Sequence, residues 1–183
     1  MAWLATFALG VVVGWAIWTY NRLVRLRNQV RAGWSDIDVQ LTRRHDLVGN
    51  LVEAVRGYAS HESALLHSVT ALRSEAMRTE SPARLATLES RLEQAVGSLF
   101  ALREAYPELK ASGNFLQLQR DLVDVEDQLQ YARRFYNGAV RQFNDGIQRV
   151  PDVVVARGSG FREAEFYQAA EGERTVPRVG EAA

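Results

Sequence analysis

The sequence predicts an all-α protein in which a single N-terminal transmembrane helix is followed by an antiparallel up-down four-helix bundle with long first and last helices. Three observations predict it: an uncharged apolar start, apolar residues that then recur every third or fourth position, and only 4 prolines and 13 glycines in 183 residues. Such spacing places apolar side chains on one helical face. The chain divides into an anchor (1–21), a cytoplasmic bundle (22–150) and a C-terminal tail (151–183) that is partly docked or disordered.

The apolar start covers residues 2–20, AWLATFALGVVVGWAIWTY, which carry no charge. As a helix they would span roughly 28 Å, close to the hydrocarbon thickness of a bilayer. Aromatic residues near both ends suit the membrane interface. A buried core helix and a cleaved signal peptide are the alternatives, but a signal peptide has a basic region before its apolar core, and the first basic residue here is Arg22. We therefore expect a retained anchor in the lipid bilayer.

Basic residues after the anchor set its expected orientation. Arginine occupies four positions directly after the apolar stretch: Arg22, Arg25, Arg27 and Arg31. Because positively charged flanks stay in the cytoplasm, we expect a single-pass protein with its short N-terminus outside and its long C-terminal part inside the cell.

Small side chains repeat every fourth residue within the anchor, at Ala2, Thr6, Gly10 and Gly14. Such a stripe lets two membrane helices approach closely, and Gly10 with Gly14 matches the GxxxG association pattern. We expect the chain to form a homo-oligomer through these glycines, or to contact other membrane proteins.

Four apolar stripes follow the anchor, and each predicts one helix of the bundle. They run from Val30 to Tyr58, from Leu65 to Ala76, from Leu85 to Tyr106, and from Phe115 to Val150. The last helix should be about 36 residues, or roughly 54 Å, long. Amphipathic helices with short connections bury their stripes against one another in a bundle.

Helix starts are marked by capping residues. Ser60 is the expected N-cap of the second helix, Ser81 with a following proline that of the third, and Asn114 with Gln117 resembles a capping box for the fourth. Pro107 should end the third helix, and ELKASG should connect it to the fourth.

Composition excludes several kinds of chemistry. The 22 basic and 22 acidic residues balance, so no net positive charge favours nucleic acid, and the chain has no cysteine to act as a nucleophile or a thiolate ligand. No glycine-rich phosphate loop or nucleotide-binding pattern is found, so we expect no cofactor and no small-molecule substrate. His61 and His67 are six residues apart, which places them roughly 240° apart around a helix, so they cannot share a metal ion. We expect no catalytic set, because a helical chain offers neither a strand-turn-helix elbow nor an obvious oxyanion hole.

One stretch remains open to a chemical interpretation. HDLVGN (His45–Asn50) resembles the pattern of histidine phosphotransfer domains, in which an exposed histidine carries phosphate. This gives an alternative function, a phosphotransfer-like signalling bundle that uses His45. Against it, the residue before Gly49 is Val48, where those domains usually have lysine, and His45 lies beside the apolar seam.

Arg44 is the one polar side chain in the first apolar seam. Its neighbours Arg43, Asp46, Glu53 and Arg56 are interpreted as a solvated face whose ion pairs contribute about 0.2–0.5 kcal/mol each. A buried arginine instead needs a partner on another helix. Arg44 is therefore expected to fix helix register or to leave room for a partner chain.

The tail differs from the bundle in composition, with a β-branched run, a glycine-rich break and the aromatic residues Phe161, Phe166 and Tyr167. These aromatics either fold back onto the bundle, which we prefer, or dock a partner.

Two long segments carry a family resemblance. YNRLVRLRNQVRAGWSDIDVQLTRRHDLVGNLVEAVRGYASHE and LFALREAYPELKASGNFLQLQRDLVDVEDQLQYARRFYNGAVRQFN, with FREAEFY and VPRV in the tail, resemble the LemA family. The resemblance implies a single-pass protein of the bacterial inner membrane with a cytoplasmic helical bundle, and it supplies no catalytic residues. The family pattern usually has tyrosine at His45 and proline at Gly49, which weakens the phosphotransfer alternative. The expected function is therefore that of a non-enzymatic interaction or scaffold module.

Overall fold

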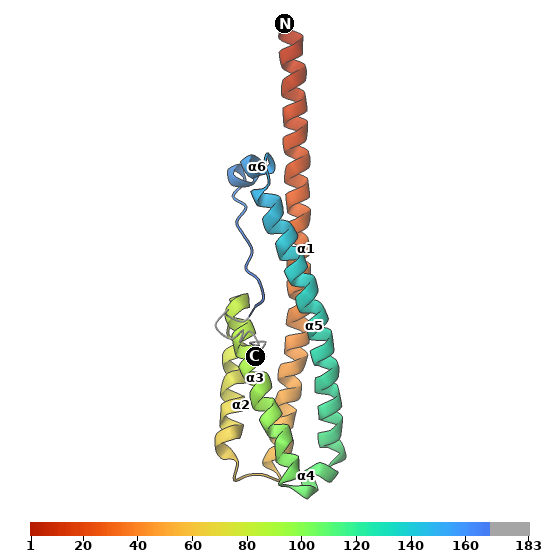
Figure 1. Cartoon of the computed structure of the whole chain (residues 1–183), viewed down its shortest axis with the longest axis vertical. Helices are drawn as coiled ribbons and strands as arrows, with labels where there is room; N and C mark the ends of the chain where they lie inside the picture. The colour runs from red at the N-terminus through yellow and green to blue at the C-terminus, as the bar shows by residue number, and fades with distance from the viewer. Residues whose placement is uncertain (169–183) are drawn as a thin grey trace, which may run out of the picture. The chain divides into compact units, whose positions relative to one another are not determined.

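The computed structural model describes residues 1–168, and this part of the chain is helical and contains no strand (Figure 1). This confirms the all-α prediction for the described residues. Its elements follow one another in this order: α1 (Ala2–Arg56), α2 (Ser63–Ala76), α3 (Pro82–Ala101), the 3₁₀ turn η1 (Leu102–Glu104), α4 (Pro107–Ala111), α5 (Gly113–Gln148) and α6 (Asp152–Gly158). They form two compact units, Met1–Arg44 with Asp124–Phe166, and His45–Val123 with Tyr167. Each unit is described separately below.

Helix α1 is 55 residues long and contains the whole apolar stretch without interruption. The expected boundary between residues 21 and 22 is therefore not a helix end. Neither glycine nor proline occurs between Gly14 and Gly33, so no strong helix breaker interrupts the chain there. Among residues 1–168, α1 is the helix that is long and apolar enough to cross a membrane, with a mean hydropathy of 1.7 over its most apolar window. Large apolar side chains of this stretch are exposed, as a lipid-facing segment requires.

The first unit consists of α1 up to Arg44, the second half of α5, and α6 with the segment after it. Its apolar core contains Leu23, Phe143, Ile147 and Ala156. Two glycines let α1 and α5 approach closely. A Cβ atom on Gly146 would lie 3.1 Å from Leu26 Cδ1, and one on Gly33 would lie 3.1 Å from the Cα of Tyr136.

The segment after α6 folds back onto the first unit. The ring of Phe161 meets the rings of Tyr20 and Phe143 edge-on, at centroid distances of 5.8 and 6.2 Å. Asn144 exchanges two hydrogen bonds with the backbone of Ala164, at 3.0 and 2.9 Å. Residues 169–183, the rest of the expected tail, lie outside the described part of the chain.

Tyr136 provides a further attachment for this segment, because its hydroxyl donates a 2.7 Å hydrogen bond to the backbone oxygen of Glu165. Burial, together with the nearby charge of Glu165, raises the pKa of the Tyr136 phenol to about 12. The phenol therefore stays protonated, and able to donate, throughout the neutral range.

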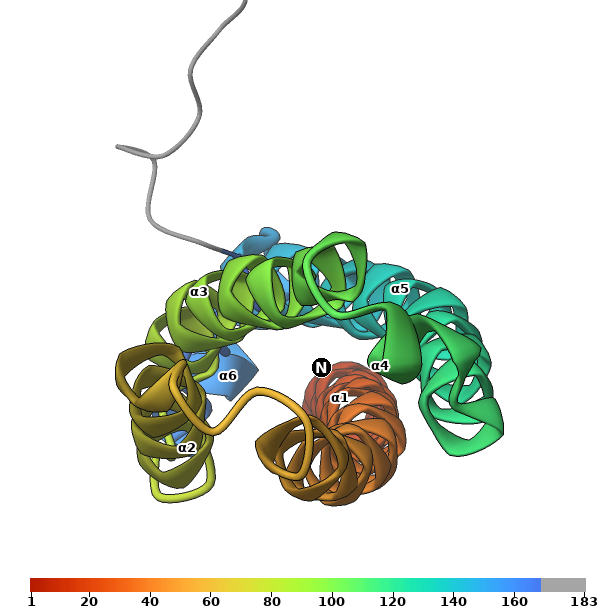
Figure 2. The same cartoon turned by 90° about the horizontal axis from the view of Figure 1, so that it is seen from below.

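The second unit consists of the last turns of α1, with α2, α3, α4 and the start of α5. Helices α2 and α3 lie side by side (Figures 1 and 2). Each helix of this unit contributes leucine, valine or phenylalanine side chains that are buried: Val48, Leu51, Val55, Leu66, Val69, Leu85, Leu88, Leu92, Leu99, Leu109 and Phe115. The ring of Phe115 also packs edge-on against Phe100, at a centroid distance of 5.5 Å.

The capping predictions have mixed outcomes. Ser81 does cap α3, since its side chain accepts a hydrogen bond from the backbone N–H of Arg84 at 3.4 Å. The prediction that Ser60 caps the second helix is wrong, because α2 begins only at Ser63, with Glu62 at the N-cap position. The predicted capping box at Asn114 is also wrong, because Asn114 already lies within α5. The hydroxyl of Ser112 instead accepts a 3.4 Å hydrogen bond from the backbone N–H of Phe115.

Helix ends differ from the apolar stripes in three places. Helix α3 ends at Ala101, and the chain reaches Pro107 through η1. Tyr58 lies beyond the end of α1 and is exposed, because helical spacing no longer applies there, and Ala59 is buried instead. Val150 lies beyond the end of α5 and is likewise exposed.

Candidate functional site

Arg44 lies in the first unit, and its side chain is buried on the side of α1 that faces α5. Its Nη1 atom is 2.6 Å from Oε2 of Glu126 on α5. The other oxygen of this carboxylate lies 3.5 Å from Nη1 of Arg133 and accepts a 2.7 Å hydrogen bond from Gln130. The Glu126 carboxylate thus forms ion pairs with two guanidinium groups, and the pair with Arg44 connects α1 to α5 in addition to their apolar packing.

His45, the next residue, belongs to the second unit and is 5% exposed. Its Nε2 atom lies 2.7 Å from Oε1 of Glu89, a residue of α3 that is fully buried. The backbone oxygen of His45 also accepts a 2.6 Å hydrogen bond from Nε of Arg73 on α2. Three helices therefore meet at this one residue.

Gly49 lies next to that arginine, with space for a Cβ atom at ordinary van der Waals distance. A Cβ atom on Gly49 would lie 3.5 Å from the guanidinium carbon of Arg73. The family resemblance implies that proline usually stands at this position, and proline would remove the N–H that an α-helix directs at the carbonyl four residues earlier, that of His45. The contact from Arg73 supplies that carbonyl with a donor of its own.

The position of His45 does not suit phosphate transfer. A histidine that accepts phosphate from a partner protein must offer a ring nitrogen to solvent, and this ring is buried with Nε2 against Glu89. The residues of the expected solvated face behave differently: Asp46 is exposed, and Glu53 forms an exposed ion pair with Arg56 at 2.9 Å.

A third buried polar contact lies at the end of the apolar stretch, in the first unit. The carboxylate of Asp152, at the start of α6, accepts a 2.8 Å hydrogen bond from Nη1 of Arg22 and a 3.4 Å hydrogen bond from the hydroxyl of Thr19. The Arg22 guanidinium also lies 5.9 Å from the ring centre of Trp18. Arg22 was predicted only to set the orientation of the anchor, and no sequence pattern indicated a role for Asp152.

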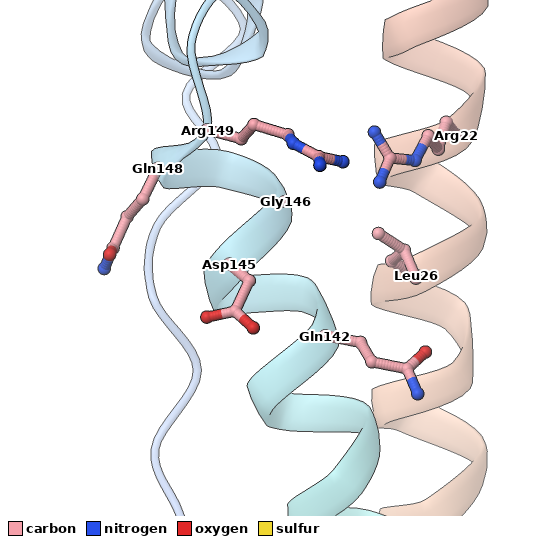
Figure 3. Close-up of a pocket in the computed structure, with 7 residues that line it drawn as sticks. All are labelled: Arg22, Leu26, Gln142, Asp145, Gly146, Gln148 and Arg149. Atoms are coloured by element: carbon pink, nitrogen blue, oxygen red, sulfur yellow. The ribbon is translucent and has the colours of Figure 1, made fainter.

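Next to this contact, α1 and α5 form the walls of a cleft of about 530 Å³. Its lining residues come from both helices and from the residue just after α5: Arg22, Leu26, Gln142, Asp145, Gly146, Gln148 and Arg149 (Figure 3). The side chains of Arg22 and Arg149 extend toward each other across it (Figure 3). A second depression on α1 shares Arg22, Leu26 and Gln142 with the cleft and continues to Trp18 and Arg25.

Gly10 and Gly14 lie on the exposed apolar part of α1. A Cβ atom on either would meet nothing within 4 Å, so on a single chain both glycines border open space. Association through them therefore stays a prediction.

Comparison with known proteins places these features in a family. A family model described as "LemA family" matches residues 33–180. Magnetosome protein MamQ 2 of Paramagnetospirillum magneticum is 25% identical over 175 residues, which cover 81% of this chain and 64% of that protein. Protein LemA of Metamycoplasma hominis is 28% identical over 158 residues, which cover 84% of this chain and 71% of that protein. The chain thus spans about 64% of the length of the magnetosome relative. Neither name denotes an enzyme.

Proposed function

Because this chain belongs to the LemA family, we propose that it is a membrane-anchored, non-enzymatic module that binds itself or other membrane proteins at the cytoplasmic face of the bacterial inner membrane. The observation that carries the proposal is the first half of α1. Its apolar residues are exposed over the length of a bilayer, and the same helix continues into residues that pack against α5. An exposed apolar surface of this size marks a membrane or protein contact.

The buried polar residues support a structural role for the rest of the chain. Arg44, His45 and Asp152 each contact an oppositely charged or hydrogen-bonding side chain from another helix. Contacts of this kind specify which helices pack together and in which register. They agree with the finer proposal of an antiparallel up-down four-helix bundle formed by α1, α2, α3 and α5.

Phosphotransfer through His45 is not favoured as a second function, because the ring that would carry the phosphate is buried against Glu89.

The proposed orientation can be tested with single cysteines, because the natural chain has none. We expect Ser98→Cys, an exposed position on α3, to react with a maleimide that does not cross membranes only after spheroplasts are permeabilised. The physical reason is the cost of moving the four arginines after the anchor across the membrane. Ala2→Cys is the control and should react in intact spheroplasts. Labelling of Ser98→Cys in intact spheroplasts would refute the orientation.

The proposed self-association predicts which face of the anchor meets a second copy. We expect Thr6→Cys, which lies on the small-residue stripe, to form a disulfide-linked dimer when membranes are oxidised. Ala8→Cys is the matched control, since it lies roughly 200° around the helix from Thr6. Adding Gly10→Ile and Gly14→Ile should abolish the Thr6 crosslink, because larger side chains keep the helices apart. Equal crosslinking at both positions would mean random collision, not a specific dimer.

A further inference from the structure

We propose that the cleft between α1 and α5 binds the phosphate group of an anionic lipid headgroup. The inference rests on the proposed membrane anchor and goes beyond it, because it assigns a ligand to a site that the anchor alone does not require. It depends on three features of the first unit, namely the level of the cleft relative to the lipid headgroups, the charges that line it and the apolar surface beside it.

The cleft lies at the depth of the lipid headgroups. Its wall on α1 is formed by Arg22 and Leu26, and the apolar stretch ends at Tyr20. Leu26 is six residues further along α1, which is about 9 Å. If residues 2–20 fill the hydrocarbon core, the cleft therefore opens within the headgroup layer next to it.

Two guanidinium groups, one in the cleft and one in the adjoining depression, are free to bind an anion. Arg149 lines the cleft and Arg25 lines the depression. Both are exposed, and neither forms an ion pair with another residue of the described chain, 1–168. Arg22 is about one-third exposed and shares its charge with Asp152. Guanidinium groups present several N–H donors in a geometry that fits phosphate oxygens.

Two carboxylates near these arginines would repel an anion, Asp152 and Asp145. Asp152 is buried against Arg22 and Thr19. Asp145 lies one turn before Arg149 on α5 and also lines the cleft. Gln142 adds an amide that points toward α1, whereas Gln148 points away and donates to Glu163 at 2.7 Å (Figure 3).

The adjoining surface indicates a lipid as the source of the phosphate. The second depression, which shares Arg22 with the cleft, reaches Trp18, and both Trp18 and Ile17 are largely exposed. An acyl chain attached to a phosphate in the cleft would therefore lie against apolar side chains. A soluble phosphate would gain nothing from that surface.

The test uses the full chain reconstituted in phosphatidylcholine vesicles that contain a trace of spin-labelled phosphatidylglycerol or spin-labelled phosphatidylcholine. The motionally restricted fraction of each label in the electron paramagnetic resonance spectrum gives their relative affinities for the protein. We expect phosphatidylglycerol to be preferred, and Arg25→Gln with Arg149→Gln to reduce this preference about fivefold for each arginine replaced. Arg141→Gln is the matched control, since Arg141 is exposed on α5 but lines neither the cleft nor the adjoining depression.

Each outcome has one meaning. An equal loss of preference in Arg141→Gln would show that general surface charge attracts the lipid, and no preference in the natural chain would likewise overturn the proposal. If inorganic phosphate added to the vesicles displaces the labelled lipid at equal concentration, the ligand is a soluble anion. Flotation of the vesicles separates this inference from the anchor: a chain that floats without lipid preference fails only here, whereas a chain that does not float refutes the anchor itself.

Discussion

Leu129→Asp is expected to lower the free energy of unfolding by about 4 kcal/mol or more, since removing a buried leucine alone costs about 2–5 kcal/mol and an unpaired buried charge adds to that. Leu129 is fully buried in the first unit, and Leu92, fully buried in the second, should respond in the same way. The measurement is denaturant unfolding of the full chain in detergent micelles, followed by far-ultraviolet circular dichroism.

Val123→Asp is the control, because it makes a similar change on α5 at a residue that is 57% exposed. It should change the free energy of unfolding by less than about 0.5 kcal/mol. If Leu129→Asp and Val123→Asp melt alike, the apolar face of α5 has been assigned to the wrong side of the helix.

His45→Ala is expected to destabilise the protein by about 1–3 kcal/mol, the usual cost of removing one partner of a buried hydrogen-bonding contact. The reason is that the Glu89 carboxylate would stay buried between helices after losing its 2.7 Å contact with the imidazole. Because this contact joins α1 to α3, unfolding should be followed by a probe of the second unit, such as hydrogen exchange in α3.

A double-mutant cycle separates the pair from its surroundings. His45→Leu combined with Glu89→Leu should recover most of the lost stability, since replacing both partners by apolar groups is often neutral. The exposed pair Glu53 and Arg56 is the matched control, and removing it should cost less than about 1 kcal/mol. Strictly additive effects of the two leucine substitutions would show that His45 and Glu89 do not interact.

The helices and most of their buried faces could be predicted from the sequence, because apolar spacing directly reflects which side of a helix leaves water. Leu85 and Phe115, at which two of the predicted stripes begin, are buried. Predictions failed where the helix ended before the stripe did, as at Tyr58 and Val150.

The buried polar contacts were only half predictable. Arg44 stood out because it interrupts an apolar seam. Glu89 did not, although it follows Leu85 by four positions and precedes Leu92 by three, and such a charged residue in a stripe is the signal that could have found it. Whether His45 is exposed depends on how α2 and α3 pack around it, which one helix's periodicity cannot tell.

Because α1 is unbroken, the rotation along it relates the faces of its apolar start to the faces that pack against α5. Leu23 and Gly33, which meet α5, are separated from Gly14 by 9 and 19 residues. At about 100° per residue, Leu23 lies roughly 180° and Gly33 roughly 100° around α1 from Gly14. At the level of Leu23, the glycine face of the anchor thus points away from α5. Two copies paired through their anchors would carry the α5 residues that meet Leu23 on the outside of the pair.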